Sequence, residues 1–211
     1  MNKSRRLMIG LAAAAVAAAP LALTVPSADA DAGDALANLR PVALNGVDGG
    51  GSALVQVHGT RIDVTMGAWG LFPDFPHAAH IHFGAQARHE CPMASDDTDQ
   101  SGTLNTTEGA PAYGPVVVSL TKTGDTSPAS TLAIDRYDTA PGGDLTYARG
   151  HIKVSQDVAK AITDGYAVIV IHGADENHDN AIDGPASDLA PSLPSEATDP
   201  ALCGTLVPQQ H

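Results

Sequence analysis

The sequence predicts an exported, single-domain, all-β protein with the architecture of a Greek-key β-sandwich or barrel. Three observations lead to this prediction. An export signal opens the chain, many short β-branched or alternating apolar runs lie between turn residues, and only one segment has the marks of a helix. The 211 residues are enough for one domain with a substantial core.

Residues 1–30 have the layout of a secretory signal peptide. A basic stretch precedes an apolar run over 7–25, and Ala28-Asp29-Ala30 offers a small-x-small cleavage site. The run is rich in Ala and contains Pro20, which favours a cleaved signal over a membrane anchor. We therefore expect a secreted, extracytoplasmic protein, and no later segment has the composition of a membrane span.

After the signal we expect a flexible lead-in over 31–40 and one β domain over 41–211. Turn signals such as Gly49-Gly50-Gly51 and Gly142-Gly143 separate the predicted strands. These strands are expected at 41–45, 52–58, 60–67, 78–83, 114–120, 130–135, 145–153, 166–171 and 202–207.

One short helix is predicted in the second half of the chain. Ser155 is its expected N-cap, Val158, Ala161 and Ile162 share one face, and Gly165 follows its end. Two long acidic loops, at 92–113 and 173–201, complete the expected organisation. Loops of this length in a compact domain are usually functional or disordered.

The charge of the chain excludes some partners and favours others. Removing residues 1–30 removes three basic residues and one acidic residue, which takes the net charge from −13 to −15. Such a chain repels nucleic acid and anionic membranes and attracts cations. Metal ions are therefore the expected partners, and nothing in the sequence identifies a protein partner.

The chain has two cysteines, Cys91 and Cys203. In an exported protein an even pair is most simply one disulfide. In the loop-entropy model, a bridge that closes more than a hundred residues stabilises the fold by roughly 4–5 kcal/mol. Metal ligation by the cysteines is the alternative, because His89 lies two residues before Cys91.

Histidines are concentrated in the segment HAAHIHFG, which contains His77, His80 and His82. On a strand, the second and third of these point to the same face, about 6–7 Å apart. His172 ends an apolar strand and supplies a third imidazole if the two strands are neighbours. Three imidazoles suit copper or zinc. The alternative is that these histidines only hydrogen-bond to loops.

The stretch GTRIDVTMGAWGLFPDFPHAAHIHFG resembles the early strands and the metal strand of the copper-zinc superoxide dismutases. That family has a His-x-x-His-x-His run. The resemblance implies that His80 and His82 are copper ligands and that His77 is structural. The family's last copper ligand ends a Val-Val-His strand, which His172 matches in Val170-Ile171-His172. His89 is then a candidate fourth ligand.

The resemblance extends to the cysteines and to a second family. Cys91 lies nine residues after His82, and Cys203-Gly204 matches the family's second disulfide cysteine. HIHFG and Tyr113-Gly114-Pro115-Val116-Val117-Val118 also resemble the chordin-type CHRD domain. The chain therefore resembles a divergent member of this broad group, of the kind found in secreted bacterial proteins.

Two departures from the dismutases affect the expected function. No histidine lies between His89 and His151, so a family-type zinc site cannot be built, and Pro200 stands where the family has its active-site arginine. If the protein is an enzyme, the resemblance implies a copper-only oxidoreductase with superoxide as the candidate substrate. The alternative is a non-catalytic secreted CHRD-like module stabilised by calcium and a disulfide. No catalytic residue is assigned.

The loop after Cys91 has the spacing of an EF-hand calcium loop. Residues 97–108 read DTDQSGTLNTTE, with Gly102 at the sixth position for the sharp turn. The flanking residues do not look like EF-hand helices, so an isolated calcium loop and a solvated acidic loop are both open. The expected ligands are Asp97, Asp99, Ser101, Thr103 through its carbonyl, Asn105 and Glu108.

A second loop of similar spacing begins just after His172. Its sixth position is Asn180, and its twelfth is Ala186, so the bidentate acid is missing; Asp188 is a candidate substitute. The sequence therefore predicts copper and calcium as cofactors, with one calcium site incomplete. The expected ligands of the second loop are Asp175, Asn177, Asp179, Ala181 through its carbonyl, and Asp183.

Overall fold

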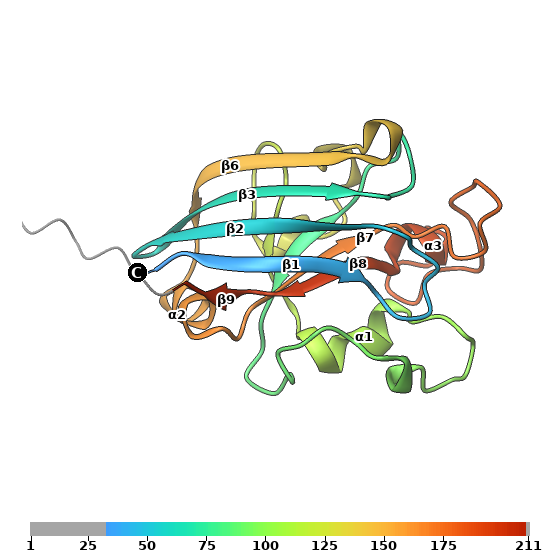
Figure 1. Cartoon of the computed structure of the whole chain (residues 1–211), viewed down its shortest axis with the longest axis horizontal. Coiled ribbons are helices and arrows are strands. Elements are labelled where there is room, and N and C mark those ends of the chain that lie inside the picture. The colour runs from blue at the N-terminus through green and yellow to red at the C-terminus, as the bar shows by residue number, and fades with distance from the viewer. Residues whose placement is uncertain (1–32, 210–211) are drawn as a thin grey trace, which may run out of the picture. The chain divides into compact units, whose positions relative to one another are not determined.

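The computed structural model describes residues 33–209, and in this range the protein is built mainly of antiparallel β-sheet (Figure 1). The predicted signal peptide lies outside the described residues. The strands are β1 (Ala35–Pro41), β2 (Gly50–His58), β3 (Arg61–Trp69), β4 (Ala79–His82), β5 (Val116–Ser119), β6 (Leu145–Lys153), β7 (Val168–His172), β8 (Pro200–Thr205) and β9 (Val207–Pro208).

The strands follow the order β5-β4-β7-β8-β1-β2-β3-β6, with β9 beside β1. Every paired strand is antiparallel, and the sheet curls into an open barrel whose two edge strands are β5 and β6. Across this open side, the Arg149 guanidinium of β6 donates to the carbonyl oxygens of Thr121 and Gly124. The all-β class predicted from the sequence is confirmed.

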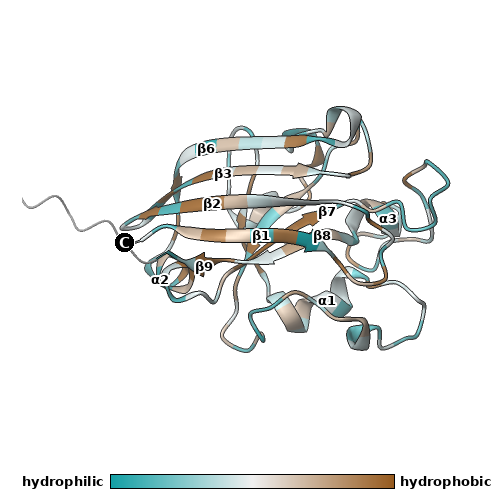
Figure 2. Cartoon of the chain, in the orientation of Figure 1, coloured by the Kyte–Doolittle hydropathy of each residue, from teal (hydrophilic) through white to brown (hydrophobic). Residues whose placement is uncertain are grey.

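The concave side of the sheet holds the main apolar core. Burial alternates along β1, β3 and β6, which is the period-2 pattern of strands with one solvated face, and Figure 2 shows the matching alternation in hydropathy. Strand β7 is buried on both faces. Ile169 and Ile171 point into the main core, whereas Val168 and Val170 join a second cluster on the outer face.

The helices cover the ends and the outer face of this sheet. Helix α2 (Gln156–Asp164) matches the sequence prediction, because Ser155 Oγ accepts from the Val158 amide and Gly165 ends the helix in the left-handed conformation. The other helices are α1 (Thr106–Tyr113), α3 (Ser195–Thr198) and 3₁₀ helices at Ala94–Asp96, Pro128–Ser130, Ile134–Arg136 and Pro141–Gly143. No helix in residues 33–209 is both long enough and apolar enough to cross a membrane.

Four expectations about the elements are wrong. The lead-in expected over 31–40 contains strand β1 from Ala35, because alternate residues ALANL face the core, and the strand expected at 41–45 is a turn. The strand expected at 130–135 is replaced by 3₁₀ turns, since Tyr137 anchors that segment by donating to the Ser130 carbonyl. Helix α1, which begins at the Asn105 N-cap, was expected to be loop.

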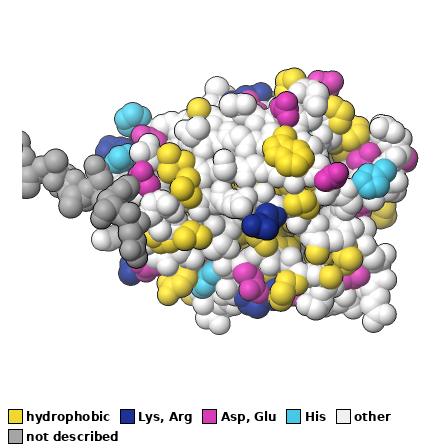
Figure 3. Space-filling view, in the orientation of Figure 1, with side chains coloured by type: hydrophobic (Ala, Val, Ile, Leu, Met, Phe, Trp, Pro, Cys, Tyr) yellow, Lys and Arg dark blue, Asp and Glu magenta, His cyan; other side chains and the backbone are white. Residues whose placement is uncertain are grey.

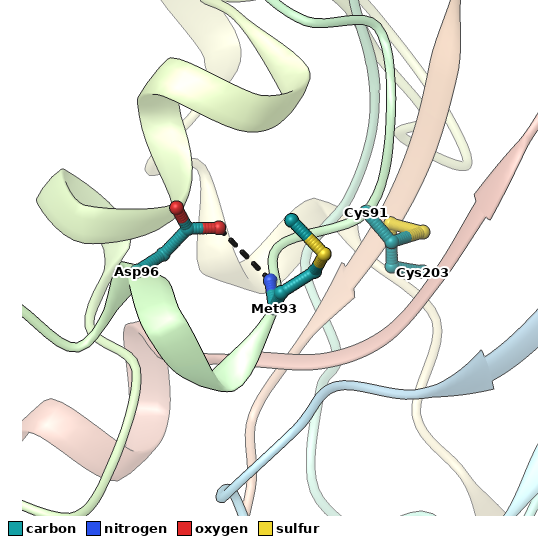
Figure 4. Close-up of a disulfide and its surroundings, with 4 residues drawn as sticks. All are labelled: Cys91, Met93, Asp96 and Cys203. Atoms are coloured by element: carbon teal, nitrogen blue, oxygen red, sulfur yellow. Dashed lines mark hydrogen bonds between the residues drawn. A yellow bond between two sulfur atoms is a disulfide. The ribbon is translucent and has the colours of Figure 1, made fainter.

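The predicted disulfide between Cys91 and Cys203 is present, with the Cα atoms 5.7 Å apart (Figure 4). Cys203 on β8 pairs with Val170 on β7, so the bridge lies on the outer face of the sheet. Just beyond Cys91, the Met93 amide donates to the Asp96 carboxylate at 2.9 Å and starts a 3₁₀ turn. The bridge therefore ties the segment that leads to α1 onto the sheet.

Candidate metal centre

Strand register brings three histidines together on the outer face of the sheet. His80 and His82 of β4 lie opposite Val170 and Val168 of β7, so these side chains share one face. His172 ends β7 two residues after Val170 and points the same way. One ring nitrogen from each histidine lies within 4.8 Å of those of the other two, and all three side chains are buried. The predicted convergence is confirmed.

Each ring is held by a hydrogen bond at its other nitrogen. Tyr137 Oη donates to the Ser130 carbonyl and therefore accepts from His80 Nε2 at 2.9 Å. His82 Nδ1 donates to the Gly114 carbonyl at 2.8 Å. The remaining nitrogens of these two rings, His80 Nδ1 and His82 Nε2, are buried and have no partner within the described structure.

The third ring follows the same rule. His172 Nδ1 donates to the Thr198 carbonyl at 2.6 Å, and Nε2 is buried without a partner in the described chain. Fixing one nitrogen by a hydrogen bond sets the tautomer and leaves the other nitrogen as a free lone pair. Copper and zinc bind imidazole nitrogens of this kind, and each of the three buried rings has one such nitrogen without a partner.

The environment keeps the three imidazoles neutral. Burial lowers the pKa of His82 to about 3 and that of His172 to about 4, and it holds the pKa of His80 well below its usual value. The neighbouring histidines lower the pKa of His80 further, because two imidazolium charges at this distance repel. At neutral pH protons therefore do not compete with a metal for these nitrogens.

Two further histidines were assigned roles from the sequence. His77 is buried beside the group, with Nδ1 2.8 Å from the His172 carbonyl oxygen and Nε2 2.9 Å from that of Phe72, which agrees with a structural role. His89 is not part of the group, so its expected role as a fourth ligand is wrong. Its Nε2 donates to the Gly84 carbonyl, and its ring packs against Phe83 and Tyr166.

The first acidic loop brings its carboxylates together. Carboxylate oxygens of Asp97, Asp99 and Glu108 lie within 4.8 Å of one another. The Ser101 amide donates to Asp97 and Asp99, and the Gly102 amide donates to the second oxygen of Asp97. Glu108 comes from the first turn of α1, so the loop runs directly into a helix. From the sequence, no helix is expected at this flank.

The second acidic loop repeats this geometry. The Asp179 amide donates to the side chains of Asp175 and Asn177, and the Asn180 amide donates to the second oxygen of Asp175. The fourth and sixth residues of both loops have positive φ: 59° and 92° at Gln100 and Gly102, and 60° and 68° at His178 and Asn180. The second loop's His and acidic side chains do not form a three-residue cluster within 4.8 Å among the described residues.

Glu196 takes the place of the acid that is missing from the second loop. In the first loop, Glu108 accepts from the amides of the second and ninth residues, Thr98 and Asn105, one at each oxygen. In the second loop, Glu196 accepts in the same way from the amides of the second and ninth residues, Glu176 and Asp183, at 3.1 and 2.8 Å.

Asp188, the substitute expected from the sequence, has a different role. Its carboxylate accepts from the Thr107 amide at 2.6 Å and caps helix α1. Sequence spacing missed Glu196 because the chain inserts a loop between the ninth position of the pattern and helix α3, which carries this acid. The only sequence signal for Glu196 is its position at the start of a short helix that follows several prolines.

Glu176 of the second loop and Asp199 form a pair of interacting carboxyl groups. Asp199 is 2% exposed, and burial together with the neighbouring Glu176 raises its pKa to about 8. Burial and the charge of Glu196 raise the pKa of Glu176 to about 7. No sequence pattern predicts this pair, because the two residues belong to different segments that only the fold brings together.

Positive charge is absent from the lining of the cavity next to the histidine group. The cavity above it has no Lys or Arg among its lining residues. On the face shown in Figure 3, Lys and Arg side chains lie apart from one another and form no continuous positive patch. An anion would therefore find no cationic guide at the cavity, in agreement with the expectation from Pro200 and the acidic composition.

Comparison with known proteins adds no family assignment. No protein-family model matches the chain, and a search of curated proteins gives no significant match. The three-histidine group, the two acidic loops and the disulfide therefore carry the functional argument.

Proposed function

We propose that the protein is an exported copper-binding protein, related to the copper-zinc superoxide dismutases and to CHRD-like modules, with calcium in its acidic loops. The observation that carries the proposal is the group formed by His80, His82 and His172, in which every ring has one nitrogen anchored and one free. A disulfide of this kind is compatible with an oxidising, extracytoplasmic location.

The donor set favours copper over other metals. Three neutral imidazoles suit both copper and zinc, and divalent copper binds nitrogen sites more tightly than zinc does. The group contains no carboxylate or thiolate, and the cysteines are used in the disulfide. The family's zinc site has no counterpart, because the segment that should supply its histidines forms an acidic loop and α1.

Copper held here would supply one-electron redox chemistry, which is the basis of superoxide dismutation in the family that the chain resembles. The protein's own residues fix the ligands. The Tyr137 hydroxyl and the carbonyls of Gly114 and Thr198 hold the three rings in fixed orientations. Superoxide is the candidate substrate of an enzymatic form.

A second candidate function is a non-catalytic secreted module that binds copper without turnover. The cavity without Lys or Arg favours it, because fast reaction with an anion depends on positive steering. In this form the disulfide and the two calcium loops stabilise the fold. Calcium suits both loops because they present oxygen ligands at alternate positions around a sharp turn.

The decisive experiment is copper titration of chelator-treated protein, followed by electron paramagnetic resonance. We expect one Cu(II) per chain with nitrogen hyperfine structure. The variant His82→Ala should lose stoichiometric binding, whereas the matched variant His89→Ala should keep it, because His89 lies outside the group. Equal copper binding by His82→Ala and the parent protein would refute the proposal.

A further inference from the structure

The three histidines lie at the inner end of a cavity of about 190 Å³. Their side chains are at most 3% exposed, whereas Leu132 and Leu189, which also line the cavity, are 46% and 44% exposed. These two leucines therefore mark the mouth of the cavity. A ligand that enters between them meets the free ring nitrogens of the histidine group at the far end.

The walls between mouth and histidines are apolar. Ile134 lies beside Leu132 in the segment that carries Tyr137, and Ala110, Tyr113 and Val116 come from α1 and β5. No charged residue lines the cavity. A fully charged molecule would lose its hydration there, and no charged side chain of the lining would compensate for that loss. The walls therefore select for an uncharged, mainly apolar molecule.

The inner end has the opposite character. His80 Nδ1, His82 Nε2 and His172 Nε2 have no partner in the described chain. A metal bound by three protein ligands keeps a coordination position for an external donor atom. The site thus combines one metal coordination position with an apolar chamber. A matching ligand has one donor atom and an otherwise apolar body.

We propose that this cavity takes a small molecule made of one aromatic ring with a single uncharged nitrogen or oxygen donor atom. Its size supports a single ring, since an apolar cavity of about 150 Å³ is known to take up benzene. A chamber of about 190 Å³ holds such a ring and a short alkyl substituent. The donor half of the proposal rests on copper binding as proposed above, whereas the apolar half is independent of the metal.

The test uses the copper-loaded protein and a series of neutral ligands of constant donor type: pyridine, 4-methylpyridine and 4-ethylpyridine, with azide as the anionic comparison. Each added carbon buried in the cavity should tighten binding about fourfold. Affinity is measured by calorimetry and by the shift of the copper absorption band. Azide should bind more weakly than 4-ethylpyridine.

Two leucine variants provide the controls. Leu132→Ser should remove most of the gain from the alkyl group, because this side chain forms the mouth of the cavity. Leu36→Ser should not, because Leu36 is a similarly exposed leucine of β1, 41% exposed, that does not line the cavity. Equal affinities along the pyridine series, or azide binding more tightly than 4-ethylpyridine, would overturn the inference and leave copper binding intact.

If the protein binds no copper, the proposed function fails and the cavity is tested without metal. Toluene is then titrated into the metal-free protein and followed by methyl NMR. Saturable shifts of the Leu132 and Leu189 methyl groups would support the apolar ring site. Their absence at saturating toluene would overturn it.

Discussion

Single hydrogen bonds decide what the three histidines can do. A buried imidazole with a backbone carbonyl oxygen beside each nitrogen has a structural role, as His77 has beside this group. His80, His82 and His172 differ because the backbone and Tyr137 satisfy only one nitrogen of each ring. The cost of three buried, unpaired lone pairs is a physical reason to expect a bound cation.

Acid should destabilise the metal-free protein through these histidines. Burial lowers the folded pKa of His82 to about 3 and that of His172 to about 4 and holds that of His80 well below its usual value, whereas unfolded histidines titrate near 6.5. The unfolded state therefore binds more protons, and the free energy of unfolding falls as pH drops from about 6.5 towards 4. Urea unfolding of chelator-treated protein at several pH values measures this slope.

The variant His82→Gln tests the assignment, because glutamine can still donate to the Gly114 carbonyl but does not titrate. Part of the acid slope should disappear. The control is His151→Asn at an exposed histidine with φ of 59°, a conformation that asparagine tolerates. A slope that His82→Gln leaves unchanged would contradict the buried, neutral state of this ring.

The carboxyl pair of Glu176 and Asp199 should act in the opposite direction. Both have raised pKa values, about 7 and about 8, so the folded state holds protons that the unfolded state has released. Stability from this pair is complete below pH 4 and is lost as pH rises through 7 to 8. In chelator, the melting temperature should fall over this range.

Asp199→Asn keeps the shape of the side chain and removes its charge. The variant should be more stable than the parent at pH 8.5 and similar to it at pH 5, as measured by thermal unfolding in chelator. The exposed Asp144→Asn should show no such difference. A parent protein that is more stable than Asp199→Asn at pH 8.5 would mean that Asp199 is ionised without penalty.

The ligand histidines could be predicted from the sequence, and their supporting groups could not. The spacing of His80 and His82 on a strand fixes a common face, and the end of an apolar strand identifies His172. Tyr137 and the Thr198 carbonyl come from distant loops whose course no local pattern determines. His89, the expected fourth ligand, lies outside the group, because its ring packs against Phe83 and Tyr166 and its Nε2 donates to the Gly84 carbonyl.

At the scale of elements, helix α3 connects the second acidic loop to the histidine group. Glu196 accepts from two amides of the loop, and two residues later the Thr198 carbonyl accepts from His172 Nδ1. Four residues thus hold both a loop that presents oxygen ligands and a histidine that presents nitrogen. The first loop has the simpler arrangement, with its glutamate in the helix that follows it directly.

We expect two calcium ions per chain, with Glu196 essential for one of them. Glu196→Gln should reduce the calcium stoichiometry from two to one in calorimetry, as Glu108→Gln should for the first loop. Each site at a hundredfold excess of calcium over Kd adds about 2.7 kcal/mol, or roughly 5–10 °C in melting temperature. Loss of one site should halve the total rise in melting temperature that the two sites produce together.

Asp188→Asn is the matched control for Glu196→Gln. It should keep both calcium ions and lose about 1 kcal/mol or less, because the Asp188 carboxylate caps helix α1 and accepts from no amide of the second loop among the hydrogen bonds of the described residues. If Asp188→Asn removes a calcium ion and Glu196→Gln does not, the assignment of the second loop is reversed.

Element prediction succeeded where local chemistry was strong. Helix α2 has an N-cap, an apolar face and a glycine end, and strand β6 has a clear period-2 pattern. Helix α1 contains Gly109 and Pro111, which disfavour a helix, and it forms because Asn105 and Glu108 build a capping box. Strand β1 was taken for a lead-in because its Ala residues are weakly apolar.

At the scale of the whole molecule, acidic charge and one long-range bridge dominate. The predicted Cys91–Cys203 disulfide joins residues 112 apart and fixes the α1 segment over the outer face, where the histidines lie. The resemblance implied this pairing, and the even number of cysteines favoured it. The open, curled form of the sheet was not predictable in detail, because it depends on the pairing of β1 with β8 and β3 with β6.

The last prediction concerns superoxide and the charge of the whole protein. Dismutases near the diffusion limit work at about 10⁸–10⁹ M⁻¹s⁻¹ and need positive potential at the metal. Here the cavity has no Lys or Arg, and Asp175, Glu176 and Asp179 closely follow His172. We expect the copper-loaded protein to be inactive or well below this limit, with a weak or inverse response to salt.

Added positive charge should raise any dismutation rate, as measured by pulse radiolysis of the copper-loaded protein. Calcium in the second loop adds two charges near His172, and Leu132→Lys adds one at the mouth of the cavity. Leu36→Lys adds the same charge on β1, outside the cavity lining, and should have little effect. A calcium-independent rate at the diffusion limit that falls steeply with salt would show that the field at the site attracts anions, and would favour the enzymatic form over the non-catalytic one.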